Sequence, residues 1–330
     1  MQNSTLEDTS VQAHNYFAGG LMIVLGFAGL IPYVLFNLTV VTTKEYRDNT
    51  YFLLALGQGL LDCCGCCYFI FYVSWVTILQ ITPFGPVVDA ALGAVALVVW
   101  FGSFPFMITL ALNRYYCVCR RHEYSLIFNK KLVAKIAIFA YAFGFGLGMS
   151  TTAKGCNLMV YPELYAIGYN VEFTCGTVLN YVDLGLSTLT AVTATVCNSV
   201  VFAKYKFMHR QIAPGTNDVN DEREKIKRQR EFKLFTQFFV IASWMAFTNG
   251  MAFFAPAFGV SKWFGLWTSV GFIVNCSINA WVYVGLNKSL RARIKGMVLN
   301  QPVNPTMLTA ANVSGKVFTI SQRSEAAGKM

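Results

Sequence analysis

The chain has 330 residues, of which 55% are hydrophobic and only 13% are charged. One large soluble globule needs more polar side chains on its surface, so this composition excludes it and indicates a membrane protein with several spans. The formal net charge of +10 could suggest a nucleic-acid partner, but the basic residues cluster beside apolar runs, and we expect no nucleic-acid binding.

The amino-terminal residues MQNSTLEDTS lack the basic start and the small-residue cleavage site of a secretory signal. The first apolar run should therefore be retained as a helix, with residues 1–16 forming a short acidic segment outside the cell. Asn3 begins a glycosylation sequon, Asn-Ser-Thr, and we expect it to carry a glycan.

Seven apolar runs are long enough to cross a bilayer. A helix rises about 1.5 Å per residue, so about 20 apolar residues span a hydrocarbon core of about 30 Å. The predicted helices are residues 17–41, 51–76, 89–116, 132–152, 178–203, 232–256 and 263–286. The sequence thus predicts an all-α membrane protein with a seven-helix domain over residues 17–286.

The basic residues orient these helices in the lipid membrane. With the amino terminus outside, 24 of the 26 Lys and Arg residues lie in the inner loops and the tail. Only Lys154 and Lys262 then lie outside. The positive-inside rule therefore predicts a multi-pass plasma-membrane protein with its carboxyl terminus in the cytoplasm.

Asp62 is the only carboxylate deep inside a predicted span. An acid in the membrane is a functional candidate by default, and its expected partners on neighbouring helices are Ser103, Asn275 and Asn279. A protonated, hydrogen-bonded structural Asp is the alternative. The run CCGCC follows at residues 63–67, but thiolates are unfavourable in lipid and no His is near, so we expect helix packing and no metal site.

The third predicted helix ends in Asn113, Arg114 and Tyr115, after 24 residues without a charge. This triplet resembles the acidic-Arg-Tyr motif of rhodopsin-like G-protein-coupled receptors. The resemblance implies that these residues form the G-protein-coupling switch at the inner end. Because Asn113 replaces the acid, no adjacent salt bridge can form, and the inactive lock must be weaker or use another group. Glu231 at the foot of the sixth helix is our candidate.

The seventh predicted helix resembles the rhodopsin-like Asn-Pro-x-x-Tyr helix, with Asn279 and Tyr283 in register and part of the same switch. Ala280 replaces the proline, so the helix keeps a backbone hydrogen bond and the usual kink is in doubt. The alternative is that the polar residues of this helix only form hydrogen bonds to neighbouring helices and so stabilise the bundle. Residues 287–299 predict an amphipathic helix on the inner membrane surface, and residues 300–330 a disordered tail.

Cys156 and Cys175 both fall between the fourth and fifth predicted helices, in an oxidising space, so they can form a disulfide with each other. Rhodopsin-like receptors usually tie this loop to the top of the third helix. Asp89 stands at the corresponding place here, which leaves that tie unsupported.

The outer halves of helices three, five, six and seven hold the candidates for ligand contact. Aromatic residues in spans more often pack or anchor than line a site. Ala96 stands where amine-binding receptors carry an acid, which disfavours a cationic amine. The candidate residues are Trp100, Asn180, Asp183, Trp244, Asn249 and Trp267.

The resemblance to rhodopsin-like receptors also bears on cofactors, because a second-helix Asp binds sodium in that family. Counting from the start of the helix puts Leu60 at that position, so Asp62 is displaced by two residues. Either a helix irregularity restores the site or the sodium site is absent. We expect no other cofactor.

Over roughly residues 17–295 the chain resembles the nematode serpentine chemoreceptors, with class T the closest pattern and class X its competitor. The resemblance implies a small-molecule ligand, a heterotrimeric G protein as partner and a place in sensory neuron cilia. The residues that carry the likeness are Gly57, Leu60, Leu61, Asp62, Gly93, Trp100, Leu110, Ala111, Leu112, Asn113, Arg114, Leu234, Phe235, Thr236, Gln237, Tyr283, Leu286, Asn287 and Lys288.

Two other classes of function compete with a chemosensory receptor. A transporter or channel usually shows repeats, broken helices or several charges in the membrane, and the spans show none of these. A receptor-like partner protein without its own ligand is the other alternative. We expect no enzyme, because His14, His122 and His209 lie outside the predicted membrane core.

Overall fold

The computed structural model describes residues 2–153, 155–210, 239–241, 243–244, 246–248, 250–251 and 261–299. The chain divides into two compact units, Met1–Trp281 and Val282–Met330. The first unit holds most of the membrane helices, and the last helix of the bundle crosses the boundary between the units.

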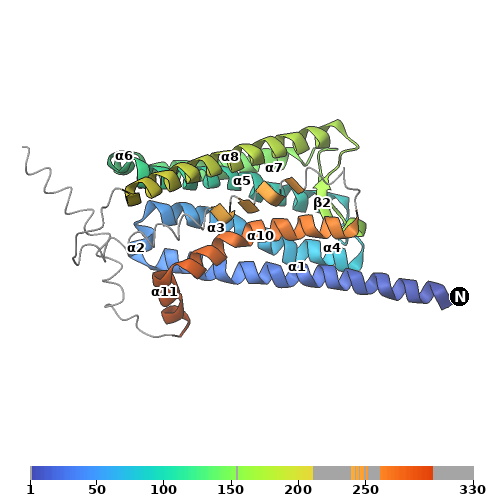
Figure 1. Cartoon of the computed structure of the whole chain (residues 1–330). Coiled ribbons are helices and arrows are strands. Elements are labelled where there is room, and N and C mark those ends of the chain that lie inside the picture. Colours follow the sequence, from blue (N-terminus) through green and yellow to red (C-terminus); the bar gives the residue numbers. More distant parts are fainter. Residues whose placement is uncertain are drawn as a thin grey trace, which may run out of the picture. The chain divides into compact units, whose positions relative to one another are not determined.

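Long helices running side by side make up the first unit (Figure 1). Short helices α2 (Lys44–Arg47) and α6 (Arg121–Ile127) lie in the connections on one end of it. The long elements are α1 (Gln2–Thr42), α3 (Thr50–Tyr68) continued by the π-helical turn η1 (Phe69–Val73) and α4 (Ser74–Leu79), α5 (Pro86–Cys119), α7 (Lys130–Ser150), α8 (Thr174–Arg210) and α10 (Lys262–Leu286).

Six of these helices are long and apolar enough to cross a membrane. They are Ser10–Thr42, Thr50–Leu79, Pro86–Cys119, Lys130–Ser150, Thr174–Lys204 and Lys262–Leu286, and they match six of the seven predicted spans. The remaining prediction, residues 232–256, lies largely outside the described residues; the part that is described is helical and apolar, within Phe239–Thr248.

Two helices extend beyond their predicted ends. The helix α1 already begins at Gln2, since the predicted outer segment contains no Pro or Gly that would stop it. The helix α8 continues to Arg210, seven residues beyond the predicted span 178–203, so the inner loop begins as a helix.

Asparagine side chains begin several of the helices. Asn49 accepts a hydrogen bond from the backbone N–H of Tyr51 at 3.0 Å, and Asn129 accepts one from Leu132 at 2.9 Å. Such caps satisfy N–H groups that have no partner within the helix. Beside them Lys130 Nζ lies 2.6 Å from Asp48 Oδ1, and this hydrogen bond holds the pKa of Asp48 below its ordinary value.

The helix α5 lies at the centre of the first unit and packs against α3, α7 and α8. Its aromatic residues Trp100, Phe101 and Phe104 belong to the larger hydrophobic core, and Phe106 and Leu110 belong to a second core towards the α6 end. The two groups of residues described below around Arg114 and around Trp100 therefore both include side chains of α5.

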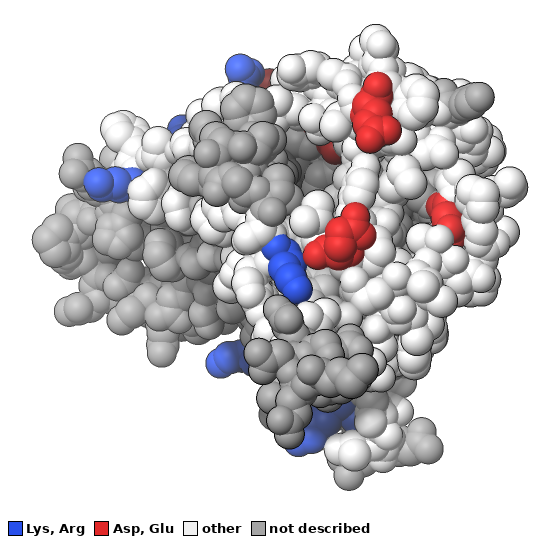
Figure 2. Space-filling model, turned by 90° about the vertical axis from the view of Figure 1, so that its right-hand side faces the viewer, with Lys and Arg blue, Asp and Glu red and all other residues white. Residues whose placement is uncertain are grey.

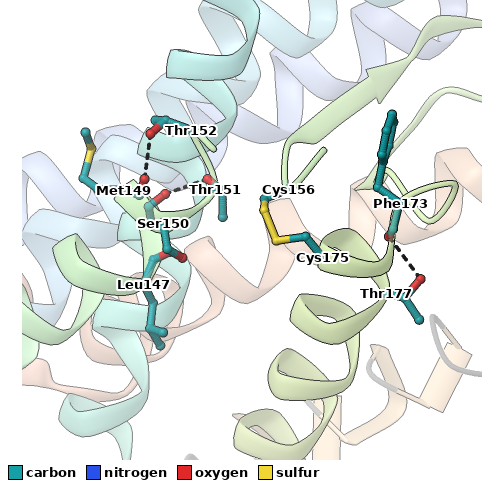
Figure 3. Close-up of a disulfide and its surroundings, with 10 residues drawn as sticks. Leu147, Met149, Ser150, Thr151, Thr152, Cys156, Phe173, Cys175 and Thr177 are labelled. Atoms are coloured by element: carbon teal, nitrogen blue, oxygen red, sulfur yellow. Dashed lines mark hydrogen bonds between the residues drawn. A yellow bond between two sulfur atoms is a disulfide. The ribbon is translucent and has the colours of Figure 1, made fainter. Parts of the chain in front are cut away.

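A two-stranded hairpin follows α7, which the prediction of an all-helical chain did not include. The strands β1 (Leu158–Tyr161) and β2 (Ala166–Tyr169) are antiparallel and are joined by the turn η2 (Pro162–Leu164). A disulfide joins Cys156, just before β1, to Cys175 in the first turn of α8 (Figure 3). The loop is thus cross-linked within itself, by the pair of cysteines that the sequence singled out.

The second unit contains the end of α10 and the helix α11 (Lys288–Val298), within the predicted residues 287–299. Asn287 caps α11 by accepting a hydrogen bond from Leu290 N at 3.1 Å. Arg291 donates to the carbonyl oxygens of Val284, at 3.2 Å, and Gly285, which lie at the end of α10 where cations are favourable. The predicted tail, residues 300–330, lies outside the described residues.

Candidate functional site

The inner switch predicted from the sequence centres on Arg114 near the end of α5. Its guanidinium carbon lies 4.3 Å from the centre of the Tyr51 ring, in the first turn of α3. A cation over an aromatic face is attracted by about 0.5–2 kcal/mol, depending on its exposure to water. An aromatic ring therefore contacts this arginine, and the residue before it in sequence is the neutral Asn113.

The neighbouring Asn113 is buried and turns to α6. Its Nδ2 donates to the hydroxyl of Tyr124 at 3.3 Å, and that hydroxyl lies 3.1 Å from Thr50 Oγ1 at the start of α3. This chain of hydrogen bonds joins α5, α6 and α3. Asn113 thus links the helix ends by neutral hydrogen bonds, as its amide cannot form an ion pair.

The other predicted switch residues do not all meet Arg114 in the described part of the chain. Tyr115 instead interacts with Arg120, which also pairs with Glu123 at 2.9 Å. Tyr283 lies in the second unit, and Glu231 lies outside the described residues.

The acid in the second predicted span, Asp62, is 3% exposed and accepts a hydrogen bond from the Tyr33 hydroxyl of α1. Asn279 of α10 lies close enough to act on the Asp62 carboxylate as a donor, although its Nδ2 has no partner in good geometry among the described residues. The structure therefore brings Asp62 and Asn279 together and adds Tyr33, which sequence reasoning missed.

Two further residues were expected beside Asp62. Ser103 donates its hydroxyl to the backbone oxygen of Trp100 at 2.7 Å, within its own helix. Asn275 is buried, and its Nδ2 has no acceptor among the described residues. Neither side chain makes a hydrogen bond to Asp62 in the described part of the chain.

The irregularity of the second span lies beyond Asp62. The helix α3 is regular from Thr50 to Tyr68, and the π-helical turn follows at Phe69–Val73. It does not change the register between the helix start and Asp62. Even so, Leu60 is 50% exposed whereas Asp62 is buried, so Asp62 and not Leu60 faces the bundle.

Asp183 of α8, which is half-buried, is the second polar centre and lies near the hairpin. Its Oδ1 accepts hydrogen bonds from Trp100 Nε1 at 2.6 Å and from the Ser187 hydroxyl at 3.0 Å. Its Oδ2 accepts one from the Tyr169 hydroxyl of β2 at 3.1 Å. The structure thus unites Trp100 and Asp183, two of the predicted ligand contacts, and adds a tyrosine from the hairpin.

The remaining predicted ligand contacts lie elsewhere. Trp267 is 64% exposed and Asn180 is also exposed, so neither joins the buried group. Trp244 Nε1 donates to the backbone oxygen of Gly271 at 3.3 Å, between two helices. Asn249 lies outside the described residues.

The hairpin is seated on several helices by hydrogen bonds. Tyr165, only 1% exposed, donates its hydroxyl to Asn15 Oδ1 of α1 at 2.6 Å, and its backbone oxygen accepts from Ser269 of α10 at 2.8 Å. Gln80 Nε2 donates to Pro162 O at 3.0 Å. Asp89, near the start of α5, accepts a hydrogen bond from Tyr72 at 2.8 Å.

Comparisons with known proteins identify a family and a fold. A family model described as serpentine type 7TM GPCR chemoreceptor Srx matches residues 23–282. The fold is similar to a crystal structure of squid rhodopsin, with a TM-score of 0.63, 14% identity and coverage of 86% of this chain and 85% of that one. A search of curated proteins found no match in sequence.

These findings confirm the predicted seven-helix membrane fold and the resemblance to serpentine chemoreceptors. They leave the choice between class T and class X open. At 14% identity the rhodopsin likeness shows the fold alone.

Proposed function

Because this chain belongs to the serpentine type 7TM GPCR chemoreceptor family, we propose that it binds a small molecule from outside and activates a heterotrimeric G protein. It is a multi-pass membrane protein of the receptor type. Its proposed location is the plasma membrane, with the amino terminus outside, the carboxyl terminus in the cytoplasm and sensory cilia as the site of action. Receptors of this family and fold are typically not enzymes.

The contact between Arg114 and the Tyr51 ring carries this proposal. A contact of about 0.5–2 kcal/mol is weak enough for a partner to displace, because ligands shift populations by amounts of this size. A guanidinium released at the helix end could then donate to carbonyl or carboxylate groups of a G protein. Glu231 remains our proposed additional partner in the resting state.

Nucleotide exchange tests the proposal directly. The purified protein would be reconstituted with a heterotrimeric G protein, and exchange would be measured against a panel of volatile and water-soluble small molecules. Receptor function requires at least one molecule to accelerate exchange. Solute or ion flux through protein-containing liposomes, without any exchange, would instead identify a transporter or channel.

The proposed orientation gives a topology prediction. We expect a glycan on Asn3 and a tail after Leu286 that is cytosolic, because 24 of 26 basic residues then lie inside. Glycosidase treatment should shift the mobility of the wild type but not of Asn3→Gln, and external protease should spare a carboxyl-terminal tag on intact cells. Removal of that tag from outside would overturn the topology.

The oxygen atoms around Asp62 are of the kind that a hard cation takes. The carboxylate of Asp62 and the hydroxyl of Tyr33 would hold sodium, which would supply a positive charge to a buried acid. We propose sodium as a candidate regulator on this basis. Replacing sodium by potassium at equal ionic strength should then raise basal exchange in the wild type and leave Asp62→Asn unchanged.

We also propose that Asp62 and Asn279 act as a pair in activation. Exchanging them, Asp62→Asn with Asn279→Asp, should restore part of the ligand-driven exchange that Asp62→Asn loses. Coupled residues typically show interaction energies of about 0.5–3 kcal/mol, a factor of a few or more in an equilibrium. Purely additive effects in the double variant would show that the two residues act independently.

A further inference from the structure

The charge of Asp183 is not compensated within the described residues. Its three hydrogen-bond donors, Trp100, Tyr169 and Ser187, are all neutral. The ion pairs found in the described part of the chain join Arg120 to Glu123 and Lys130 to Asp48, in the connections at the α2–α6 end. Residues 247–260, which precede α10, contain no Lys or Arg at all.

The carboxylate of Asp183 can accept one more hydrogen bond. An ionised carboxylate offers about four acceptor positions, of which Trp100 and Ser187 occupy two on Oδ1 and Tyr169 one on Oδ2. A half-buried carboxylate with neutral partners is unfavourable because it has left water without a counter-charge. A positively charged group at the free position of Oδ2 would relieve this.

Two of the hydrogen-bond donors to this carboxylate, Trp100 and Tyr169, are aromatic. The rings of Trp100 and Phe272 lie 4.7 Å apart between centroids, and Tyr169 reaches the carboxylate from the hairpin. Aromatic faces attract cations through their negative quadrupole, most strongly for Trp and Tyr. A carboxylate among such rings is chemically suited to an ammonium group that is only weakly hydrated.

The end of the molecule that carries the hairpin favours the approach of cations. Asp89, Glu163 and Glu172 lie at this end together with Asp183, whereas Lys262 is the basic residue described there. Figure 2 looks onto this end and shows acidic side chains around a hollow in its surface, with a basic side chain beside one of them. An excess of one sign of charge around a concave surface raises the local concentration of the opposite ion.

We propose that Asp183 is the recognition group for a small organic cation, an amine or a quaternary ammonium compound, bound against the rings of Trp100 and Tyr169. This inference rests on the proposed receptor function and names the chemical class of its ligand. Ala96 of α5 made a cationic amine unexpected, because amine-binding receptors carry an acid at its place. This expectation is revised, since Asp183 supplies an acid from α8 instead. The cation would either displace the Tyr169 hydroxyl of the hairpin from Asp183 or bind to the carboxylate beside it.

The test compares probes that differ only in charge. Thermal unfolding of the purified full-length protein in detergent would be followed with choline and with its neutral analogue, in which carbon replaces nitrogen. A second pair is isoamylamine and isoamyl alcohol. We expect a cation of at least one pair to raise the Tm in a saturable way and its neutral partner not to do so.

Variants then assign the effect to Asp183. Asp183→Asn keeps an oxygen that accepts from Trp100 and should weaken cation binding at least tenfold. Glu172→Gln removes a charge from the same end of the molecule and is the matched control, with binding retained. Asp183→Glu keeps the charge and should retain measurable binding, which guards against a loss caused by misfolding.

Two outcomes would overturn the assignment. One is that neither cation stabilises the protein more than its neutral partner, and the other is that Asp183→Asn binds the cation as tightly as the wild type. The binding assay contains no G protein, so it can succeed where nucleotide exchange fails. Exchange driven by neutral molecules and unaffected by Asp183→Asn would retain the receptor function and reject the cation site.

Discussion

Replacing Arg114 with alanine is expected to lower the rate of ligand-driven nucleotide exchange more than tenfold, while surface delivery and ligand binding persist. The side chain lies in the last turns of α5 against the ring of Tyr51, far along the helix from Trp100. Its removal takes from the resting state the cation–π contact with Tyr51, which is weak. In the active state it would remove the charged donor that we propose to contact the G protein.

The comparison needs a second arginine at the same end of the molecule. Arg120 follows α5 directly, is exposed and forms a salt bridge with Glu123, so Arg120→Ala is the matched control and should keep most of the exchange activity. Tyr51→Ala should leave coupling intact and raise basal exchange by a few-fold at most, since it releases Arg114 from its resting contact.

Normal signalling from a surface-expressed Arg114→Ala protein would reject the switch assignment. The arginine would then be a boundary residue whose long side chain reaches from the membrane towards water. Surface labelling of each variant separates this result from a simple loss of expression.

The membrane spans and the position of Arg114 could be predicted from the sequence, but the partner of Arg114 could not. Span prediction needs only the length of uncharged runs. The contact with Tyr51 depends on how the start of α3 meets the end of α5, more than sixty residues apart in sequence. The same holds for the hydrogen bond from Tyr33 to Asp62, because a lone tyrosine in an apolar run carries no directional signal.

The side chains facing the protein interior were harder to predict than the spans. In a soluble helix the polar face marks the outside, whereas a membrane helix is apolar both towards lipid and towards its neighbours. Trp267 was therefore a reasonable ligand contact by sequence, yet it is 64% exposed. The hairpin was missed for another reason, since strands of four residues in a loop resemble any short apolar run.

A glycine pair in α7 should be among the most sensitive positions of the whole protein. A Cβ on Gly144 would lie 2.8 Å from both Cα and N of Gly102 in α5, and one on Gly148 would lie 2.7 Å from Val98 N and 2.9 Å from Ala94 O. Small residues four apart let two membrane helices approach closely enough for their backbones to touch. Here the two glycines form that surface against α5.

Gly144→Val is therefore expected to abolish most of the folded protein at the cell surface. The clashing atoms belong to the backbone of α5 and cannot rotate away, so the helices must separate. Overpacking of this kind typically costs about 1–3 kcal/mol and sometimes more. Size-exclusion chromatography of a fluorescent fusion, together with the Tm of any folded fraction, would measure the loss.

Gly146 is the matched control, because it lies between the two in sequence and a Cβ there meets nothing within 4 Å. Gly146→Val changes helix propensity and side-chain volume equally, so it isolates the effect of contact with α5. Equal expression of Gly144→Val and Gly146→Val would show that α5 and α7 do not touch here. Since α5 also carries Trp100 and Arg114, partial separation of the helices should impair both cation binding and G-protein activation in any Gly144→Val protein that survives.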